Sequence, residues 1–522
     1  MIDGEMQAYA LTLDKFLDHA AKWHPTTEVV TAKEDGSRSR IGYAALKDRS
    51  QKCSAVLAGL GISQGDRVAT LAWNSQAHVE VWYAVLGMGA VCHTLNPRLT
   101  EAQLASMVAQ SEARVLIASS DLAALACRVA VRSPGLDTVL VIDGDAPEGA
   151  LPLAPAIEKA SSDVAWGEFS ETAPSGLCFT SGTTGAPKGV TYTHRSSYLH
   201  TLRLLQADVM AIASRDTILA AVPMFHANAW GLPFAAPAAG ARLVLPGRAL
   251  DGASLARLIN EENVTIAVGI GTVWLGLVEH LEAHGGETPS LERIIVGGAP
   301  MAPALMARIE ERLGVSVQTS WGMTELSPLG TCAPPADPER SAQNSGRPAV
   351  GVDLMLADAE GRPLDQQRGV EGHLHVRGPA VLERYFGHDE SATTDGGWFN
   401  TGDLARIEPD GALVITGRAK DLIKSGGEWI NPAEIEAVIN EHPEVSLSAV
   451  IGRPDPKWGE RPMLIVQTRE SGDISDEALL APLHGRVATW WIPDAVVRLN
   501  QMPLASTGKI DKMRLRLDHA GS

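Results

Sequence analysis

A run of hydroxyl-bearing and glycine residues, Thr180–Gly185, is the segment of the sequence best suited to binding phosphate. The amide N–H groups and hydroxyls of such a loop can face phosphate oxygens, and Lys188 adds a positive charge nearby. The spacing of glycines and lysine that defines a Walker P-loop is absent. The apolar segments 176–179 and 190–192 flank the run and favour a loop held between two strands over a flexible linker.

Five further short motifs follow this loop along the chain. They are VPMFHANAWG (222–231), VGGAP (296–300), WGMTE (321–325), WFNTGD (398–403) with GRAKDLIKSGGEWI (417–430), and PLASTGKID (503–511). In this order, the loop and these motifs resemble the adenylate-forming superfamily of acyl-CoA synthetases, luciferases and peptide-synthetase adenylation domains, from Leu11 to Leu515. The resemblance implies an ATP-dependent carboxylic acid–CoA ligase, which converts an acid to its acyl-adenylate and then transfers the acyl group to coenzyme A.

The resemblance implies an ATP site assembled from distant motifs. Trp321 offers a flat face on which adenine can stack, where much of the family has Tyr, and Thr319 stands where relatives often have Gln or Asn. Thr324 is similar to the residue that bonds the α-phosphate, Asp403 to the one that accepts both ribose hydroxyls, and Arg418 to one that reaches the ribose or phosphate. The expected ATP contacts are Thr180, Ser181, Gly182, Thr183, Thr184, Gly185, Lys188, Gly298, Ala299, Pro300, Ser320, Trp321, Gly322, Met323, Thr324, Asp403, Arg418 and Lys509.

The resemblance also implies catalytic roles for Lys509, Thr184, Glu325 and His226. Lys509 would bridge the carboxylate of the acid and the α-phosphate, in the first half-reaction only. Glu325 and Thr184 would hold Mg²⁺, a hard cation that takes oxygen ligands. His226 would lie near the reacting carboxylate, either as a base for the incoming thiol or only as a residue that moves as the thiol enters.

Other residues are expected to bind the acid and CoA. The walls of the acid pocket would include His226, Trp230, Gly297, Gly298 and Pro328, together with Phe234 and Ala299. Lys420 stands at the hinge position, about which the small domain turns between the half-reactions. After that turn CoA would meet Lys424, Ser425, Gly426, Gly427, Glu428 and Trp429, because paired glycines let the backbone approach the thin pantetheine arm.

Alternating helix-like and strand-like segments must position the first motifs. Up to about residue 300 they predict mainly parallel sheets covered by helices, and the short strands after Pro348 predict a small antiparallel sheet or distorted barrel. The last 100 residues read as a small mobile α+β domain with helices at 432–440 and 476–488, and Lys512, Arg514 and Arg516 read as solvated surface. We expect an N-terminal adenylation domain over 1–417, a hinge at 418–421, and a C-terminal domain over 422–522 that carries Lys509.

The composition limits the class of protein. A length of 522 residues exceeds a single core, which stops growing at roughly 250–300 residues. The net charge of −18 disfavours nucleic acid as a partner. Five cysteines without CxxC spacing predict reduced thiols in a cytoplasmic protein and no zinc site, and no apolar stretch is long enough for a transmembrane helix. The oligomeric state is open between a monomer and a homodimer.

The sequence argues against several competing activities. GISQG (61–65) fits the serine-hydrolase spacing, but a helix before it and a strand after it are the reverse of what that motif needs. A luciferase would oxidise the same adenylate, a peptide-synthetase domain would usually adjoin a carrier protein, and a non-catalytic relative should lack Lys509 or Glu325. Segments 72–99 and 425–436 look most like the bacterial short- to medium-chain ligases, including those for methylmercaptopropionate. Aryl or long-chain acids, and another acceptor, are the alternatives.

Overall fold

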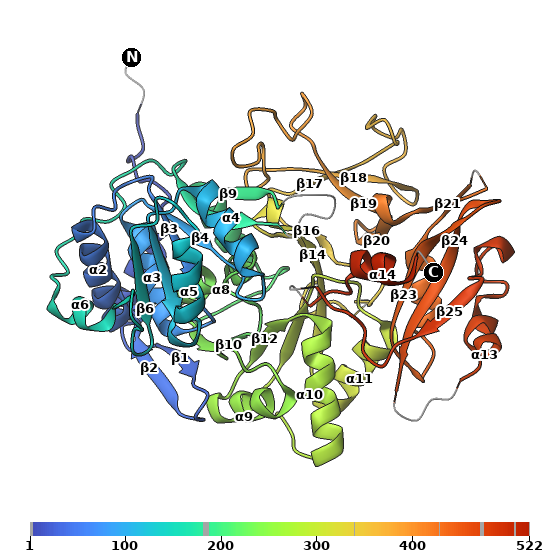
Figure 1. Ribbon diagram of the computed structural model, residues 1–522, viewed down its shortest axis with the longest axis horizontal. Helices are drawn as coiled ribbons and strands as arrows, with labels where there is room; N and C mark the ends of the chain where they lie inside the picture. The colour runs from blue at the N-terminus through green and yellow to red at the C-terminus, as the bar shows by residue number, and fades with distance from the viewer. Residues whose placement is uncertain are drawn as a thin grey trace.

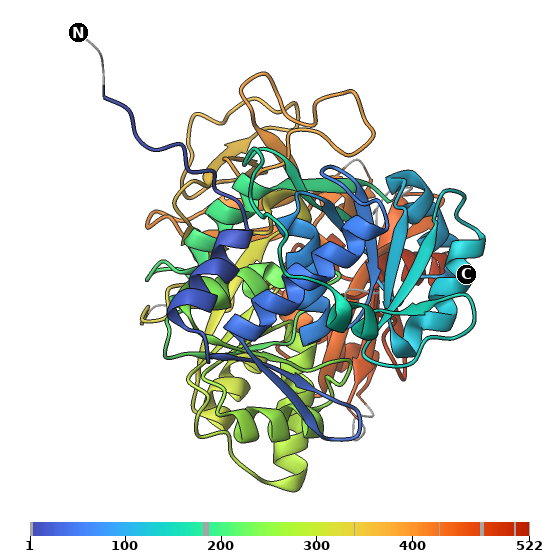
Figure 2. The same cartoon turned by 90° about the vertical axis from the view of Figure 1, so that its left-hand side faces the viewer.

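The computed structural model describes residues 4–180, 187–338, 340–426, 428–469, 474–505 and 508–520. Two large sheets with covering helices and one small sheet occupy the chain up to Arg418, and a second, smaller α+β body follows. This last body, orange to red in Figure 1, lies at one side of the larger one. The exposed residues 4–8, well before α1 (Asp14–Trp23), extend away from the rest, as Figure 2 shows. The predicted α/β class is confirmed.

The first sheet forms from apolar runs in the N-terminal part of the chain. Its seven strands lie in the order β7-β6-β5-β3-β4-β8-β9, and β9 pairs antiparallel with β8 while the other pairs are parallel. The strands are β3 (Arg67–Leu71), β4 (Val91–Thr94), β5 (Val115–Ser119), β6 (Thr138–Ile142), β7 (Leu151–Pro152), β8 (Pro174–Phe179) and β9 (Gly189–Thr193). Every residue of β5 is buried, because alternate side chains such as Val115 and Leu116 enter cores on opposite faces.

Helices cover both faces of this sheet. They are α2 (Tyr43–Gly59), α3 (Gln76–Gly87), α4 (Glu101–Ser111), α5 (Ala123–Val131) and α6 (Ala154–Lys159). The core that contains Val115 takes residues from α1, α2 and α3, and the core that contains Leu116 takes residues from α4 and α5. Ser63 lies between α2 and β3, with the helix first, so the strand–serine–helix order of a hydrolase is absent here.

The second sheet has nine strands in the order β16-β15-β14-β13-β12-β10-β11-β1-β2. They are β1 (Glu28–Ala32), β2 (Arg38–Gly42), β10 (Thr217–Ala220), β11 (Arg242–Leu245), β12 (Ile266–Gly269), β13 (Arg293–Val296), β14 (Ser316–Gly322), β15 (Leu329–Cys332) and β16 (Arg347–Pro348). The helices of this region are α7 (His194–Leu204), α8 (Leu232–Ala239), α9 (Gly252–Glu262), α10 (Gly271–His284) and α11 (Pro303–Leu313). Val30 faces α9, α10 and α11, whereas Val29 enters the same core as Val115. One apolar core is therefore shared by both large sheets.

The short strands after Pro348 form a four-stranded antiparallel sheet in the region predicted as a small sheet or barrel. Its strands pair in the order β17 (Asp353–Ala357), β18 (Glu371–Arg377), β19 (Phe399–Ile407), β20 (Leu413–Arg418). Leu356 and Phe399 share a core with Tyr192 of β9 and with Trp321. This packing holds the small sheet against the β8–β9 hairpin.

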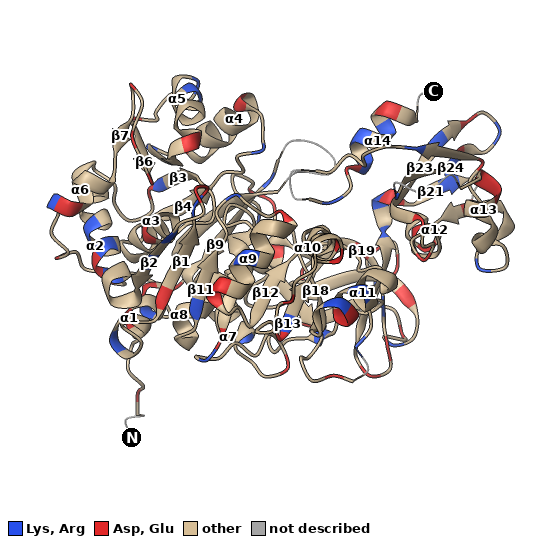
Figure 3. Cartoon of the chain, turned by 90° about the horizontal axis from the view of Figure 1, so that it is seen from below, with Lys and Arg blue, Asp and Glu red and all other residues tan. Residues whose placement is uncertain are grey.

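The C-terminal body is built on a five-stranded sheet. Its elements are β21 (Ile423–Ser425), β22 (Glu428–Ile430), β23 (Val445–Asp455), β24 (Gly459–Thr468), β25 (Ala495–Arg498), α12 (Pro432–Ile439), α13 (Asp476–Leu480) and α14 (Lys512–His519). Figure 3 shows these elements set apart from the larger body, with α14 beside β23. The helix predicted over 476–488 was too long: α13 ends at Leu480 and a 3₁₀ turn takes over at Ala481–Leu483. Pro482 has no N–H for a helical hydrogen bond, which ends the α-helix there.

The cysteines and the helices of the structure bear on two predictions made from the sequence. All five cysteines are free, and Cys127 alone among them is not fully buried. In the part of the chain that the structure describes, none of the helices has both the length and the apolarity that a membrane span requires.

Candidate active site

Three of the sequence motifs begin where strands of the nine-stranded sheet end. The His226 segment follows β10, the segment 297–300 follows β13, and Trp321 lies near the end of β14. Parallel pairing links β10 to β12, β12 to β13 and β13 to β14, so their carboxyl ends share one edge. Ligands of α/β sheets bind at such an edge. The predicted contacts on it are Gly297, Gly298, Ala299, Pro300, Ser320, Gly322, Met323, Thr324 and Pro328.

The candidate phosphate loop lies between the two strands that its apolar flanks predicted. β8 and β9 pair antiparallel on either side of it, and the Thr180 amide donates to the Lys188 carbonyl at 2.9 Å. The Lys188 ammonium lies 4.7 Å from the centroid of the Tyr385 ring. The predicted contacts Ser181, Gly182, Thr183, Thr184 and Gly185 lie outside the described residues.

Asp403 is a buried carboxylate held from two sides. Its position on β19 is directly opposite Arg418 on β20, and Arg418 Nε lies 2.8 Å from Asp403 Oδ1. The Trp321 indole Nε1 donates to Asp403 Oδ2 at 2.9 Å. Burial raises the pKa of Asp403, and the charge of Arg418 and the hydrogen bond from Trp321 oppose that rise. The structure thus brings together Trp321, Asp403 and Arg418, which the sequence analysis predicted from separate motifs.

Glu325 lies beside a tyrosine that the sequence analysis did not single out. The Tyr385 hydroxyl donates to Glu325 Oε1 at 2.9 Å, and the same ring faces Lys188. Burial and the Glu325 carboxylate raise the pKa of Tyr385, so this hydroxyl keeps its proton as a donor. Tyr385 lies in the segment 381–386, which matches none of the six motifs, so the sequence did not indicate a role for it. Tyr385 connects the predicted metal ligand to the lysine of the phosphate loop.

Lys509 reaches this edge from the C-terminal body. Gly508, with φ +83°, lies so close to Ile270 at the end of β12 that a Cβ on it would be 2.3 Å from Ile270 Cδ1. Lys509 Cε would lie 3.7 Å from a Cβ on Gly298. Lys509 is exposed to solvent in this structure, yet the protein atoms packed around it, together with the charge of Arg418, lower the pKa of its ammonium to about 8. Asp403 and Glu325 are close enough to oppose that shift. The C-terminal body is therefore docked with its predicted catalytic lysine at the sheet edge.

The lowered pKa of Lys509 predicts a loss of acid activation at alkaline pH. The ammonium is the form that carries charge, and its population falls as the pH rises through about 8. We expect kcat/KM for ATP in acid-dependent pyrophosphate exchange to fall roughly tenfold per pH unit above that value. Lys509→Arg should be slower but should show no such fall up to about pH 9.5, because guanidinium stays protonated. A flat wild-type profile over this range would contradict the prediction.

His226 and Trp230 are separated by a left-handed turn that the sequence did not predict. Ala227, Asn228, Ala229 and Trp230 all have φ between 44° and 54°. Left-handed backbone costs roughly 1–2 kcal/mol per non-glycine residue. The segment 226–230 contains no glycine, so its residues give no signal of a left-handed turn. Burial, and then the charge of Lys509, lower the pKa of His226 to about 4, so its imidazole is neutral at physiological pH.

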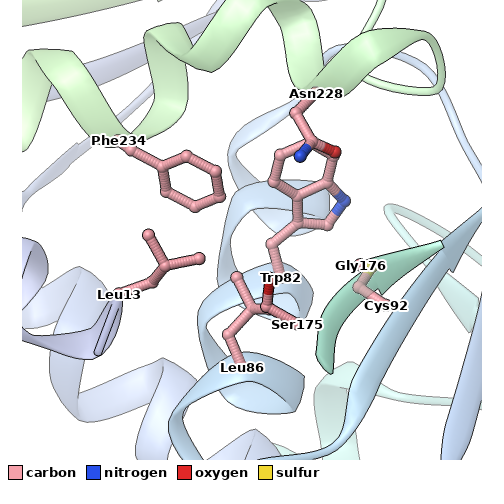
Figure 4. A pocket seen from close by; sticks show the side chains of 8 residues that line it. All are labelled: Leu13, Trp82, Leu86, Cys92, Ser175, Gly176, Asn228 and Phe234. Carbon is pink, nitrogen blue, oxygen red and sulfur yellow. The ribbon is translucent and has the colours of Figure 1, made fainter. Parts of the chain in front are cut away.

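The left-handed turn presents Trp230 to the predicted acid pocket. A Cβ on Gly297 would lie 3.1 Å from Trp230 Cη2, so the indole covers this glycine. Asn228, in the same turn, lines a small cavity that Figure 4 shows. Phe234 lines that cavity too and packs on Trp82 at 5.7 Å between ring centroids. Trp230 and Phe234, both predicted as pocket walls, belong to the same apolar cluster.

The predicted hinge is a single 3₁₀ turn, η4 (Ala419–Asp421), between the small sheet and the C-terminal sheet. Lys420 is exposed at this turn. Asn431 crosses the junction: its Oδ1 accepts from the Ala433 amide and caps α12, while its Nδ2 donates to the Thr416 carbonyl at 2.7 Å. Of the predicted CoA contacts, Lys424, Gly426, Glu428 and Trp429 are exposed, Ser425 is buried, and Gly427 lies outside the described residues.

Two residues predicted as solvated surface are instead paired. Lys512 Nζ lies 2.7 Å from Glu436 of α12, and Arg516 lies 2.9 Å from Asp421 in the hinge. The prediction was wrong because it considered only nearness to the C-terminus, whereas the packing of α14 on β23 brings both side chains against acidic partners. Arg514 pairs within its own helix and stays exposed.

Comparison with known proteins connects this geometry to a family. Residues 17–386 match the family described as AMP-binding enzyme, and residues 434–509 match the AMP-binding enzyme C-terminal domain. The chain belongs to the AMP-binding enzyme family. It is 40% identical to a 3-methylmercaptopropionyl-CoA ligase of Ruegeria lacuscaerulensis, with 98% of each chain covered. It is 38% identical to a medium-chain-fatty-acid–CoA ligase of Ectopseudomonas oleovorans, with 98% of this chain and 97% of the relative covered.

The fold agrees with solved members of the AMP-binding enzyme family. ATP-bound MatB from Rhodopseudomonas palustris superposes with a TM-score of 0.87 at 26% identity, over 98% of this chain and 99% of that one. The predicted enzyme class, an AMP-forming acyl-CoA ligase, is confirmed, and ATP and CoA are the substrates of such ligases.

Proposed function

We propose that this AMP-forming ligase activates a short- or medium-chain fatty acid, or methylmercaptopropionate, as its acyl-adenylate before transfer to CoA. The observation that carries the chemistry is the gathering of Lys509, Asp403 and Glu325 at one sheet edge, although they come from three different segments. The relatives named for 3-methylmercaptopropionate and for medium-chain fatty acids support the acid class. Aryl or long-chain acids, and an acceptor other than CoA, are the alternatives.

In the first half-reaction the carboxylate of the acid would attack the α-phosphate of ATP. Lys509 would place its ammonium between the two anions and offset the charge that grows as pyrophosphate leaves. Asp403 and Arg418 would hold the ribose, and Thr324 the α-phosphate. Glu325 fits a hard cation, since Tyr385 uses Oε1 and no hydrogen bond to Oε2 occurs within the described residues. With Thr184 it would hold Mg²⁺, which supplies charge neutralisation for the phosphates when bound.

In the second half-reaction the C-terminal body would turn at Lys420. The turn would carry Lys509 away and bring the segment 424–429 to the edge, where CoA enters. The Asn431–Thr416 hydrogen bond spans the junction and would have to yield as the body turns. His226, neutral at physiological pH, would lie beside the reacting carbonyl as a base or as a residue that moves aside.

A thioester-formation screen tests the function as a whole. Purified enzyme, ATP, Mg²⁺ and CoA would be supplied with acids from acetate to dodecanoate, with methylmercaptopropionate and with cinnamates, and AMP and thioester would be measured together. We expect CoA-dependent AMP release to be greatest with a short or medium acid. Adenylate formation without thioester for every acid would point to a different acceptor, and a clear optimum at cinnamate or dodecanoate would favour an alternative acid.

Trp230 is expected to set the depth of the acid pocket. Because its indole covers Gly297, Trp230→Ala should open space for several methylenes, each worth about 0.8 kcal/mol when buried. The kcat/KM ratio of dodecanoate to butyrate should then rise by about tenfold or more, while KM for ATP stays nearly unchanged. Trp23→Ala, an exposed tryptophan at the end of α1, is the matched control. An unchanged ranking of butyrate, octanoate and dodecanoate would place Trp230 outside the pocket.

The remaining predictions concern the setting of the enzyme. The five free cysteines support the predicted cytoplasmic location, where thiols stay reduced. The choice between a monomer and a homodimer is a matter for sedimentation analysis, and a homodimer stays a prediction. The gap between β20, which ends at Arg418, and β21, which begins at Ile423, supports the proposed domain division at 418–421.

A further inference from the structure

The Trp321 indole donates its N–H to the carboxylate proposed to bind ribose. Trp321 Nε1 lies 2.9 Å from Asp403 Oδ2, while Arg418 Nε lies 2.8 Å from Oδ1. Trp321 is 7% exposed and Asp403 is 2% exposed, so water competes little for these contacts. Buried hydrogen bonds to a charged group are among the stronger ones in proteins. The carboxylate is therefore held from both sides before any nucleotide binds.

Packing fixes the direction of this N–H. The Trp321 ring lies in a core with Tyr192 and Phe399, and a Cβ on Gly330 would lie 2.5 Å from Trp321 Cζ3. A ring enclosed in this way cannot turn without displacing its neighbours. Because little of the ring is exposed, its N–H is the part of Trp321 best placed to influence a nucleotide, and it acts through Asp403.

The geometry suits the recognition of two adjacent hydroxyls. A carboxylate has about four lone-pair sites, two on each oxygen. Trp321 and Arg418 take one site on each oxygen of Asp403 and prevent the group from rotating. The lone pairs that Trp321 and Arg418 leave free can accept hydroxyl groups, such as the 2′- and 3′-hydroxyls of a ribose. An aromatic residue without this N–H would leave Oδ2 free to turn away.

We propose that Trp321 is a positioning residue for ribose selection, which holds the Asp403 carboxylate in the orientation that accepts both hydroxyls of ATP. The inference rests on the proposed function, in which Asp403 binds the ribose. It concerns the sugar rather than the base. Stacking on adenine would treat ATP and 2′-deoxy-ATP alike, because the two nucleotides carry the same base, whereas positioning of Asp403 distinguishes them.

The test compares ATP with 2′-deoxy-ATP in acid-dependent pyrophosphate exchange, for the wild type and for Trp321→Phe. The loss of one hydrogen bond to a carboxylate corresponds to roughly 10–100-fold, so the wild type should prefer ATP by that factor in kcat/KM. In Trp321→Phe the preference should shrink to within about threefold, as expected when two changes act on one interaction. A purely structural role for Trp321 would lower kcat/KM for both nucleotides equally and leave their ratio unchanged.

Two control variants distinguish the loss of this hydrogen bond from a general loss of packing. Trp274 is fully buried, and its Nε1 has no hydrogen-bond partner in the described chain, so Trp274→Phe removes an indole without removing such a contact. Its nucleotide preference should equal that of the wild type. If Trp321→Phe does not fold, benzothienylalanine at position 321 keeps the shape of the indole and replaces the N–H with sulfur. That protein should show the same reduced preference.

The outcomes separate the inference from the function on which it rests. A wild type that uses ATP and 2′-deoxy-ATP equally well would overturn the ribose-binding role of Asp403 itself. A wild type that prefers ATP, with a Trp321→Phe or benzothienylalanine protein that keeps the full preference, would overturn the positioning role of Trp321 alone.

Discussion

Lys509→Ala should lose acid-dependent pyrophosphate exchange by on the order of 10²-fold or more, because the variant lacks the ammonium expected to offset the charge between the acid and the α-phosphate. The lysine lies beside Gly298 at the carboxyl edge of the sheet, with the Gly508 turn seated on Ile270. In that position we expect it to act in the first half-reaction, in which the acid is activated. The second half-reaction, which requires the body to turn, should not need it.

The measurement that separates the two steps is the conversion of a supplied acyl-adenylate and CoA to thioester. Lys509→Ala should carry out this conversion at close to the wild-type rate while its pyrophosphate exchange is nearly lost. Lys159→Ala removes an exposed lysine on α6, far from the site, and should leave both half-reactions intact. An equal fall of both half-reactions in Lys509→Ala would mean that Lys509 has a structural role and that its catalytic assignment is wrong.

Lys420→Pro should affect the other half-reaction: adenylate formation should be retained, and thioester formation should fall by on the order of 10²-fold. A fall of this size is expected when reacting groups are misplaced by about 1 Å. Proline fixes φ near −65° at the centre of η4 and also restricts Ala419 before it. The turn joins β20 to β21, so this restriction acts where the C-terminal body must rotate. The body should then stay in the docking that places Lys509 at the sheet edge.

Lys420→Ala is the matched control, because it removes the side chain but leaves the backbone free to turn. Its thioester formation should stay within a few-fold of the wild type. Single-turnover formation of adenylate and of thioester in the three proteins gives both rates. Normal thioester turnover in Lys420→Pro would remove Lys420 from the mechanism, and a loss in Lys420→Ala as large as in Lys420→Pro would assign the effect to the ammonium rather than to the hinge.

The sequence by itself determined the features that depend on neighbouring residues. Runs such as 67–71 and 115–119 consist mainly of apolar residues, which predicted buried strands, because a strand covered on both faces needs apolar residues at most positions. The order of the six motifs predicted the family and the enzyme class, and the apolar flanks of Thr180–Gly185 predicted the hairpin that holds the loop. Where a local signal was overlooked, as with Pro482, the predicted helix was too long.

Only the tertiary structure decided which distant side chains meet. Trp321 and Asp403 are 82 residues apart, Tyr385 and Glu325 are 60 apart, and each pair shares a hydrogen bond. The left-handed turn before Gly231 likewise contains no glycine that would signal it, so the surrounding packing must impose it. The physical reason is that propensity and periodicity are short-range properties of the chain. The direction of an N–H or a hydroxyl toward a remote carboxylate depends on strand register and on how the cores pack, which no local pattern encodes.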